Sequence, residues 1–423
     1  MNKKISLGAA VTLIIVAIAL TISVTVIVAM RYFNLQISSV SQRQQMFEYI
    51  TEIDKAVRQN YFGDINEETL RASLARGYID GIQDEYAVYL TAPEYAKETE
   101  RLSGKWTGLG LRAVEKNDGT VVIAAVDTNS AAEKAGIKKD DVLTQLDGKA
   151  IEELDFAQVA STLNNATKAK LTVTRGTESI AFEISSSTYT VNSVQSSLMG
   201  TTGYIRLTNI FSNTPAQFKD AIASLESQGA THFLFDLRGN TGGSLEAACE
   251  IIGYLLPRGT FAYKTLADGT NEDLSTTDTY EMTLPSVTLV NAQTQGEAEL
   301  FAGVLQEFKK TTVVGVKTAG RGLVQKYYTI STDGAAIRYS YASLSLADKA
   351  VIHATGITPT VVVGLTNEQE DNFDFLTADK DPQIQAGLTI LKGGAVVGTT
   401  LTTETTVQTT TTAATTSETS AAK

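Results

Sequence analysis

Few residues in this chain have the type and spacing needed to hydrolyse an amide bond. A hydroxyl can attack a carbonyl carbon when a neutral amine takes its proton, and lysine can be that amine because burial lowers its pKa. Among residues 289–309, Thr294 is the only hydroxyl, and Lys317 lies a short way downstream. A Thr294–Lys317 pair is therefore one candidate dyad, and Ser244, which follows a glycine pair, is a second candidate hydroxyl.

The segment around Thr294 carries a longer pattern. Residues 289–303 read L-V-N-A-Q-T-Q-G-E-A-E-L-F-A-G. They resemble the nucleophile segment of the carboxyl-terminal processing (tail-specific) serine peptidases, roughly V-N-x-x-S-A-S-A-S-E-I-x-A-G, in which the middle Ser is the nucleophile. Counted from Asn291 and from Glu299, that serine falls on Gly296. The resemblance therefore implies that the nucleophile has been replaced by glycine.

The base of the family is replaced as well. In relatives a Lys opens the pattern K-G-x-V-Q, and residues 321–325 here read R-G-L-V-Q, which puts Arg321 at the base position. A guanidinium stays protonated and has no acceptor lone pair, so it cannot take a proton from a nucleophile. Gln325 matches the residue that orients the Lys in relatives. The resemblance thus predicts a degenerate Ser–Lys dyad, whereas a working endopeptidase with a displaced nucleophile is the alternative.

A glycine loop completes the catalytic region of the family. Residues 236–243 read D-L-R-G-N-T-G-G and resemble the family's D-L-R-G-N-P-G-G. In relatives this loop helps to form the oxyanion hole, because glycine lets backbone N–H groups approach a developing negative charge. The resemblance assigns that role to Gly242 and Gly243. We further hypothesise that Arg321 fills the old site and pairs with Glu297, which lies next to Gly296.

Residues 104–187 resemble a PDZ domain. Gly108-Leu109-Gly110-Leu111 is similar to the loop whose N–H groups bind the carboxylate of a peptide C-terminus. Residues 130–137, S-A-A-E-K-A-G-I, resemble the PDZ pattern S-P-A-x-x-A-G-I. The helix expected over 156–164 would border the peptide groove with Val159 and Leu163. The resemblance implies that protein or peptide C-termini are the partners of this domain.

The resemblance covers residues 40–392 and implies a mixed α/β fold. A helical N-terminal region and a PDZ-like β-sandwich or barrel domain precede an α/β core like that of ClpP and crotonase. The expected domains are a signal anchor at 1–31, a helical region at 32–103, the PDZ domain at 104–190, the peptidase-like domain at 191–392 and a Thr-rich tail at 393–423. Helices of the second region pair subunits in relatives, which makes a homodimer an open hypothesis.

The two ends differ in composition from the body. Residues 5–30 hold no charged side chain and exceed the ~20 residues that span a bilayer, with Lys3-Lys4 before them. This pattern favours an uncleaved anchor that leaves the body on the extracytoplasmic side of the cytoplasmic membrane. Residues 394–423 hold 13 threonines in 30 positions, and such a segment cannot bury enough apolar surface to fold.

Composition excludes several other classes of function. The net charge of −12 argues against nucleic-acid binding. One cysteine, Cys249, allows no internal disulfide, and two histidines with that cysteine give no ordinary zinc site, so no metal or cofactor is expected. The sequence therefore predicts a membrane-anchored pseudopeptidase that binds protein C-termini. An active relative of the family is a further candidate partner. The alternatives are the active serine-type endopeptidase and a structural envelope protein.

Overall fold

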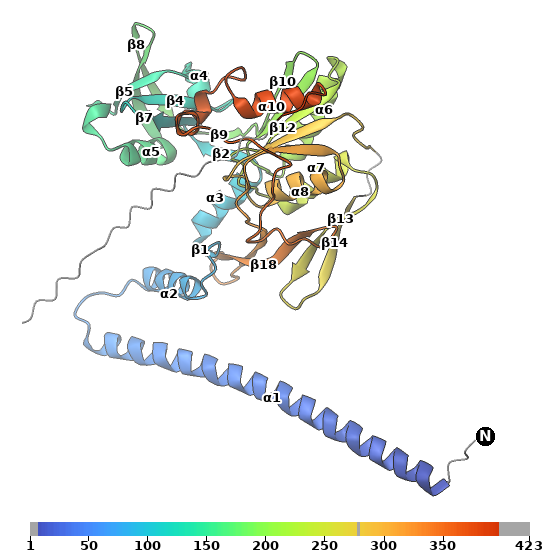
Figure 1. The fold of residues 1–423 in the computed structure, drawn as a ribbon. Helices are drawn as coiled ribbons and strands as arrows, with labels where there is room; N and C mark the ends of the chain where they lie inside the picture. Colours follow the sequence, from blue (N-terminus) through green and yellow to red (C-terminus); the bar gives the residue numbers. More distant parts are fainter. Residues whose placement is uncertain (1–6, 277–279, 397–423) are drawn as a thin grey trace, which may run out of the picture. The chain divides into compact units, whose positions relative to one another are not determined.

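The computed structural model describes residues 7–276 and 280–396 (Figure 1). The chain divides into two compact units, Met1–Leu74 and Ala75–Lys423. The Thr-rich tail expected over 393–423 lies outside the described residues from Val397 onward. The mixed α/β fold class is confirmed, with N-terminal helices, an antiparallel β domain and an α/β domain built on a mainly parallel sheet.

The first unit contains a long helix, α1 (Leu7–Asn60), and the beginning of α2 (Glu67–Gly81). Asn66 caps α2, because its side-chain oxygen accepts the N–H of Thr69 at 2.9 Å. Within the described residues, no helix combines the length and apolar character that crossing a membrane requires. The signal anchor remains a prediction from the sequence.

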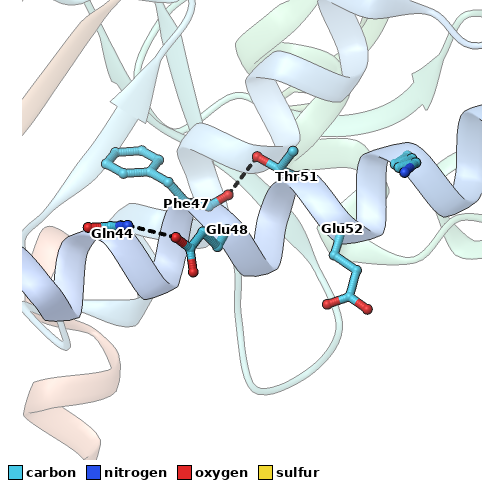
Figure 2. A pocket seen from close by; sticks show the side chains of 6 residues that line it. Gln44, Phe47, Glu48, Thr51 and Glu52 are labelled. Carbon is cyan, nitrogen blue, oxygen red and sulfur yellow. Dashed lines mark hydrogen bonds between the residues drawn. The ribbon is translucent and has the colours of Figure 1, made fainter.

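A shallow hollow of about 680 Å³ lies along α1 (Figure 2). All the side chains that line it come from this one helix. They are Gln44, Phe47, Glu48, Thr51, Glu52 and Lys55. Two hydrogen bonds in Figure 2 join successive turns, from the Gln44 amide to the Glu48 carboxylate and from the Thr51 hydroxyl to the Phe47 carbonyl. These contacts stabilise the helix itself and bring no residues from other elements together.

The PDZ domain is a curved antiparallel sheet with two short helices. Its main sheet has the strand order β3-β4-β5-β7-β8, so β3 lies at an edge, and β2 pairs separately with β9. Leu109, Ile123 and Val173 lie in its core and are at most 1% exposed. The elements are β2 (Lys105–Gly108), β3 (Leu111–Glu115), β4 (Val121–Val126), α4 (Ala131–Ala135), β5 (Val142–Leu146), β6 (Lys149–Ala150), α5 (Phe156–Asn165), β7 (Lys168–Arg175), β8 (Glu178–Ser185) and β9 (Ser187–Thr190).

The peptidase-like core is built on a sheet with the order β10-β11-β12-β15-β16-β19, parallel apart from the β10–β11 pair. Alternate residues of β12 point to opposite faces: Phe233 and Phe235 pack with α6, α7 and α8, whereas Leu234 packs with α10. The elements are β10 (Val194–Met199), β11 (Thr202–Leu207), α6 (Thr214–Ser227), β12 (His232–Asp236), α7 (Leu245–Leu255), β15 (Ser286–Val290), α8 (Glu297–Glu307), β16 (Thr311–Gly315), β19 (Val361–Val362) and α10 (Pro382–Leu391).

A second, antiparallel sheet borders this core. Its order is β1-β18-β13-β14, and β17 pairs with β18 alone among the strands of the described residues. It comprises β1 (Val88–Leu90), β13 (Gly259–Leu266), β14 (Asn271–Thr276), β17 (Leu323–Thr329) and β18 (Ala336–Leu346), and α3 (Ala92–Leu102) follows β1. Since β17 begins two residues after Arg321, this sheet positions the segment in which the family keeps its base.

The glycine loop after β12 is fixed at its start by buried charges. Arg238 forms ion pairs with Asp236 at 2.6 Å and with Asp381 at 2.7 Å, and none of the three side chains is more than 2% exposed. Because an unpaired charge would be very costly at this depth, the network holds Arg238 in one position. The loop at 239–243 therefore leaves the sheet in a defined direction.

Candidate functional site

A cavity of about 860 Å³ lies where α3, the glycine loop, the start of α8 and strand β17 meet. Both degenerate dyad positions, Gly296 and Arg321, line it. The other lining residues are Thr99, Arg101, Leu102, Ser103, Ser212, Thr241, Gly242, Gly243, Ser244, Leu245, Glu246, Lys264, Leu266, Glu272, Glu297, Leu323, Val324, Gln325, Lys326, Tyr327, Arg338 and Tyr341. The cavity thus gathers the five positions to which the resemblance assigned a catalytic role, which are Gly242, Gly243, Gly296, Arg321 and Gln325.

Gly296 forms the sharp turn between β15 and α8. Its backbone has φ +58° and ψ −122°, a conformation that glycine adopts readily and other residues adopt only with strain. A Cβ atom at this position would meet nothing nearer than the Arg321 carbonyl oxygen at 3.8 Å. The turn therefore has space for a side chain but carries none, and it lies directly beside the base position.

Arg321 is held by its neighbours in a fixed orientation. Its guanidinium donates to the side-chain oxygen of Gln325 at 3.0 Å, and its Cζ lies 4.1 Å from the ring centroid of Tyr86. Gln325 in turn donates to the Leu323 carbonyl at 2.9 Å. Gln325 thus contacts the residue at the base position, and that residue is a cation without an acceptor lone pair.

The glycine loop already has its donors engaged. The N–H of Gly243 donates to the carboxyl of Glu297 at 2.8 Å, and the N–H of Gly242 donates to the Asn240 side chain at 2.8 Å. A Cβ atom on Gly242 would clash with the same Glu297 oxygen, which shows how closely that carboxyl approaches the loop. An oxyanion hole needs free donors, and the Gly243 N–H, to which the resemblance assigns that role, is bonded to Glu297.

Glu297 is the functional residue that the sequence interpretation placed wrongly. The hypothesis that Glu297 and Arg321 pair is wrong. Their side chains form no ion pair within 4.0 Å, because Arg321 stacks on Tyr86 and the Glu297 carboxyl accepts the N–H of Gly243. A signal was available, because the family pattern has Ala where this chain has Glu297. A carboxyl group in place of a methyl group, next to the nucleophile position, is a further departure from the family pattern.

Burial raises the pKa of the Glu297 carboxyl, against the opposing effects of the Gly243 N–H and the positive charge of Arg321. The folded protein therefore binds the proton of this carboxyl more tightly than the unfolded chain does. The resulting stabilisation is complete below the unfolded pKa of 4.5 and is lost as the pH rises through the folded value.

We expect this linkage to be measurable with a Glu297→Gln variant. As the pH rises above 4.5, the free energy of unfolding of the parent should fall relative to that of the variant, which lacks the titrating group. Urea unfolding of both proteins at several pH values between about 4 and about 8 gives the difference. Parallel stability curves over that interval would show that Glu297 is not perturbed.

Glu299 joins the turn before α8 to the segment of Arg321. Its side chain is 0% exposed and accepts the N–H groups of Gly296 at 3.0 Å, Gly320 at 2.7 Å and Arg321 at 2.8 Å. It also accepts the hydroxyl of Thr318 at 2.5 Å. One buried carboxyl group thereby holds both dyad positions next to each other. Glu299 also matches the Glu of the family pattern.

The alternative hydroxyls have structural roles. Thr294 is 0% exposed, donates to the Leu237 carbonyl at 3.0 Å and accepts the Asn291 N–H at 3.0 Å, whereas Lys317 is exposed. Ser244 caps α7 by accepting the Ala247 N–H at 3.2 Å. The structure does not bring Thr294 and Lys317 together as a dyad.

The predicted peptide-binding residues of the PDZ domain divide into backbone and core. Gly110 has φ +76°, and a Cβ there would overlap the Ser130 side chain, so the loop requires glycine. The side chains of the other predicted contacts are in the domain core: exposure is 1% for Leu109, 7% for Leu111, 0% for Val159 and 3% for Leu163. Gly108 ends β2. Strand β3 lies at the edge of its sheet and contacts α5, and peptide binding by the predicted residues stays a prediction.

Comparisons with known proteins agree with this architecture. Residues 201–363 match the model of peptidase family S41, and residues 107–185 match that of the PDZ domain. The carboxy-terminal processing protease CtpA of Bacillus subtilis (strain 168) is 29% identical over 349 residues, 81% of this chain and 74% of that protein. A probable CtpA-like serine protease of Staphylococcus epidermidis (strain RP62A) is 27% identical over 384 residues, 88% and 78% of the two chains.

Among solved structures, the putative S41 protease from Bacteroides fragilis has a TM-score of 0.56 at 18% identity. The match covers 79% of this chain and 91% of that one, and it supports the fold alone. Sequence motifs, fold and relatives therefore agree. The chain therefore contains a PDZ domain ahead of a peptidase family S41 domain, and it is similar in sequence to carboxy-terminal processing proteases.

Proposed function

We propose that this chain is a pseudopeptidase that binds protein or peptide C-termini through its PDZ domain without cleaving them. The observation that carries the proposal is the 2.8 Å hydrogen bond from the Gly243 N–H to the Glu297 carboxyl. This hydrogen bond blocks the oxyanion loop. In addition, the nucleophile position has no side chain, and the base position holds a permanent cation.

Three separate requirements of the reaction are affected. Acyl transfer needs an attacking group, a proton acceptor and donors for the developing oxyanion. Here Gly296, Arg321 and Glu297 stand at the three places, and none of them can do that work. Relatives are named serine proteases, so cleavage by this chain is the competing function that the test must address.

The place of action belongs to the same proposal. The charge-free residues 5–30, preceded by Lys3 and Lys4, are the support for an anchor in the cytoplasmic membrane with the body outside the cytoplasm. Fractionation of cells that produce the chain, followed by protease treatment of intact protoplasts, would test this. A body that is protected in intact protoplasts would contradict the proposed side of the membrane.

We expect no peptide cleavage by the full-length protein. Incubation with an unstructured test protein, followed by mass spectrometry, should give the same fragments as incubation in buffer. Fragments that increase in proportion to the concentration of the chain and persist through purification would contradict the proposal. A Thr294→Val variant would then show whether the displaced hydroxyl is responsible.

We expect a labelled peptide with a free C-terminus to bind the full-length protein saturably. Amidation of that terminus removes the charge of the ligand and should weaken binding at least about tenfold, because charge-assisted hydrogen bonds are the strong ones. Fluorescence anisotropy measures both peptides in the same buffer. Equal dissociation constants for the acid and the amide would contradict recognition of C-termini.

A further inference from the structure

Some of the cations that line the cavity around Gly296 form ion pairs with carboxylates, and others do not. Arg101 and Arg338 both pair with Glu98, at 2.7 and 3.5 Å, and Lys264 pairs with Glu272 at 2.7 Å. Two further lining cations, Arg321 and Lys326, form no ion pair within 4.0 Å in the described part of the chain. The cavity therefore carries positive charge that no internal carboxylate takes up.

Arg321 is the better defined of these two cations. Stacking at 4.1 Å on Tyr86 and the hydrogen bond to Gln325 fix the plane of its guanidinium. The bond to Gln325 is the one hydrogen bond of this guanidinium within residues 7–276 and 280–396, so most of its five N–H groups are left for another acceptor. A planar guanidinium held in this way matches the geometry of a carboxylate, which it binds with two parallel hydrogen bonds.

None of the three acids that line the same cavity forms an ion pair with Arg321 within 4.0 Å. Glu272 is paired with Lys264, Glu297 accepts the Gly243 N–H, and Glu246 accepts the hydroxyl of Ser244 at 3.0 Å. The replacement of serine by glycine adds room beside Arg321, since a Cβ at Gly296 would be 3.8 Å from its nearest neighbour.

Strand β17 provides the second part of the site. Five consecutive residues of this strand, 323–327, line the cavity. Because successive side chains of a strand point to opposite faces, an unbroken run of lining residues means that the cavity follows the backbone edge of β17. Among the described residues the strand pairs with β18 and with no other strand, which leaves its second edge for an extended peptide that adds as a strand.

We propose that this cavity binds an extended peptide segment that bears a carboxylate, with its backbone along β17 and its carboxylate on the guanidinium of Arg321. The carboxylate comes from an Asp or Glu side chain or from a peptide C-terminus. The inference rests on the proposed function, because a peptide can stay bound in this cavity only if the chain does not cleave it. The replacement at the base position then supplies a binding group.

Two pairs of labelled peptides test this on the full-length protein. One pair differs by Asp against Asn inside an extended, amidated peptide, and the other by a free against an amidated C-terminus in a peptide without acids. We compare the parent, Arg321→Gln and Lys97→Gln, which removes the same charge from an exposed residue of α3 outside the cavity. Fluorescence anisotropy gives the dissociation constants.

In at least one pair, the parent and Lys97→Gln should bind the carboxylate peptide about tenfold more tightly than its neutral twin, and Arg321→Gln should lose that preference. The pair that responds identifies the source of the carboxylate. Equal preferences in the parent and Arg321→Gln for both pairs would overturn the inference, and would assign any preference for a free C-terminus to the PDZ domain. Mass spectrometry of the same samples reports cleavage separately, so failure of the proposed function is distinguishable.

Discussion

A Gly296→Ser/Arg321→Lys variant should still cleave no detectable peptide, and the further change Glu297→Ala should raise cleavage by about 10²–10³-fold. The double change restores the nucleophile and the base, because the turn at Gly296 has space for a side chain beside the segment of Arg321. It leaves the Gly243 N–H bonded to the Glu297 carboxyl. One missing oxyanion donor is worth that factor in other acyl-transfer enzymes.

The measurement is the rate of cleavage of an unstructured protein by the parent, the double variant and the triple variant. Glu297→Ala alone is the matched control, since it frees the loop but supplies neither nucleophile nor base. Circular dichroism must show that each variant is folded, because a serine at φ +58° costs about 1–3 kcal/mol. Equal rates for the double and triple variants would mean that Glu297 does not block the loop.

The proximity of Gly296 and Arg321 could be predicted from the sequence because each motif is local. The turn before α8 and the start of β17 have fixed numbers of residues between landmarks such as Asn291, Glu299 and Gln325. The structure places Gly296 and Arg321 side by side in one cavity, as that register requires. The same reasoning identified the PDZ domain and the α/β core.

The contacts of the replaced side chains could not be predicted in this way. Glu297 bonds to Gly243, 54 residues earlier, and Arg321 stacks on Tyr86, which precedes the PDZ domain in the chain. Opposite charge and proximity in the sequence suggested that these two residues pair with each other. Each group instead has another partner within reach. The Glu297 carboxyl has a backbone N–H donor, and the Arg321 guanidinium has an aromatic face.

The second large effect concerns stability: Glu299→Ala should lower the free energy of unfolding by about 3–5 kcal/mol. Glu299 is fully buried and accepts three backbone N–H groups and the hydroxyl of Thr318. Its removal leaves these donors without their acceptor, and each buried donor left unsatisfied costs about 1–3 kcal/mol, part of which water entering the space recovers. Urea unfolding at constant m-value measures the difference.

Glu297→Ala is the matched control, because it removes another buried glutamate, 6% exposed, two residues away. That carboxyl accepts a single loop N–H, and burial disfavours its charged form, so its removal at neutral pH should change stability by no more than about 1 kcal/mol. The contrast between neighbours separates a carboxylate that holds the site together from one that fills it. Similar losses for the two variants would show that burial alone, and not the number of donors served, sets the energetic role of each glutamate.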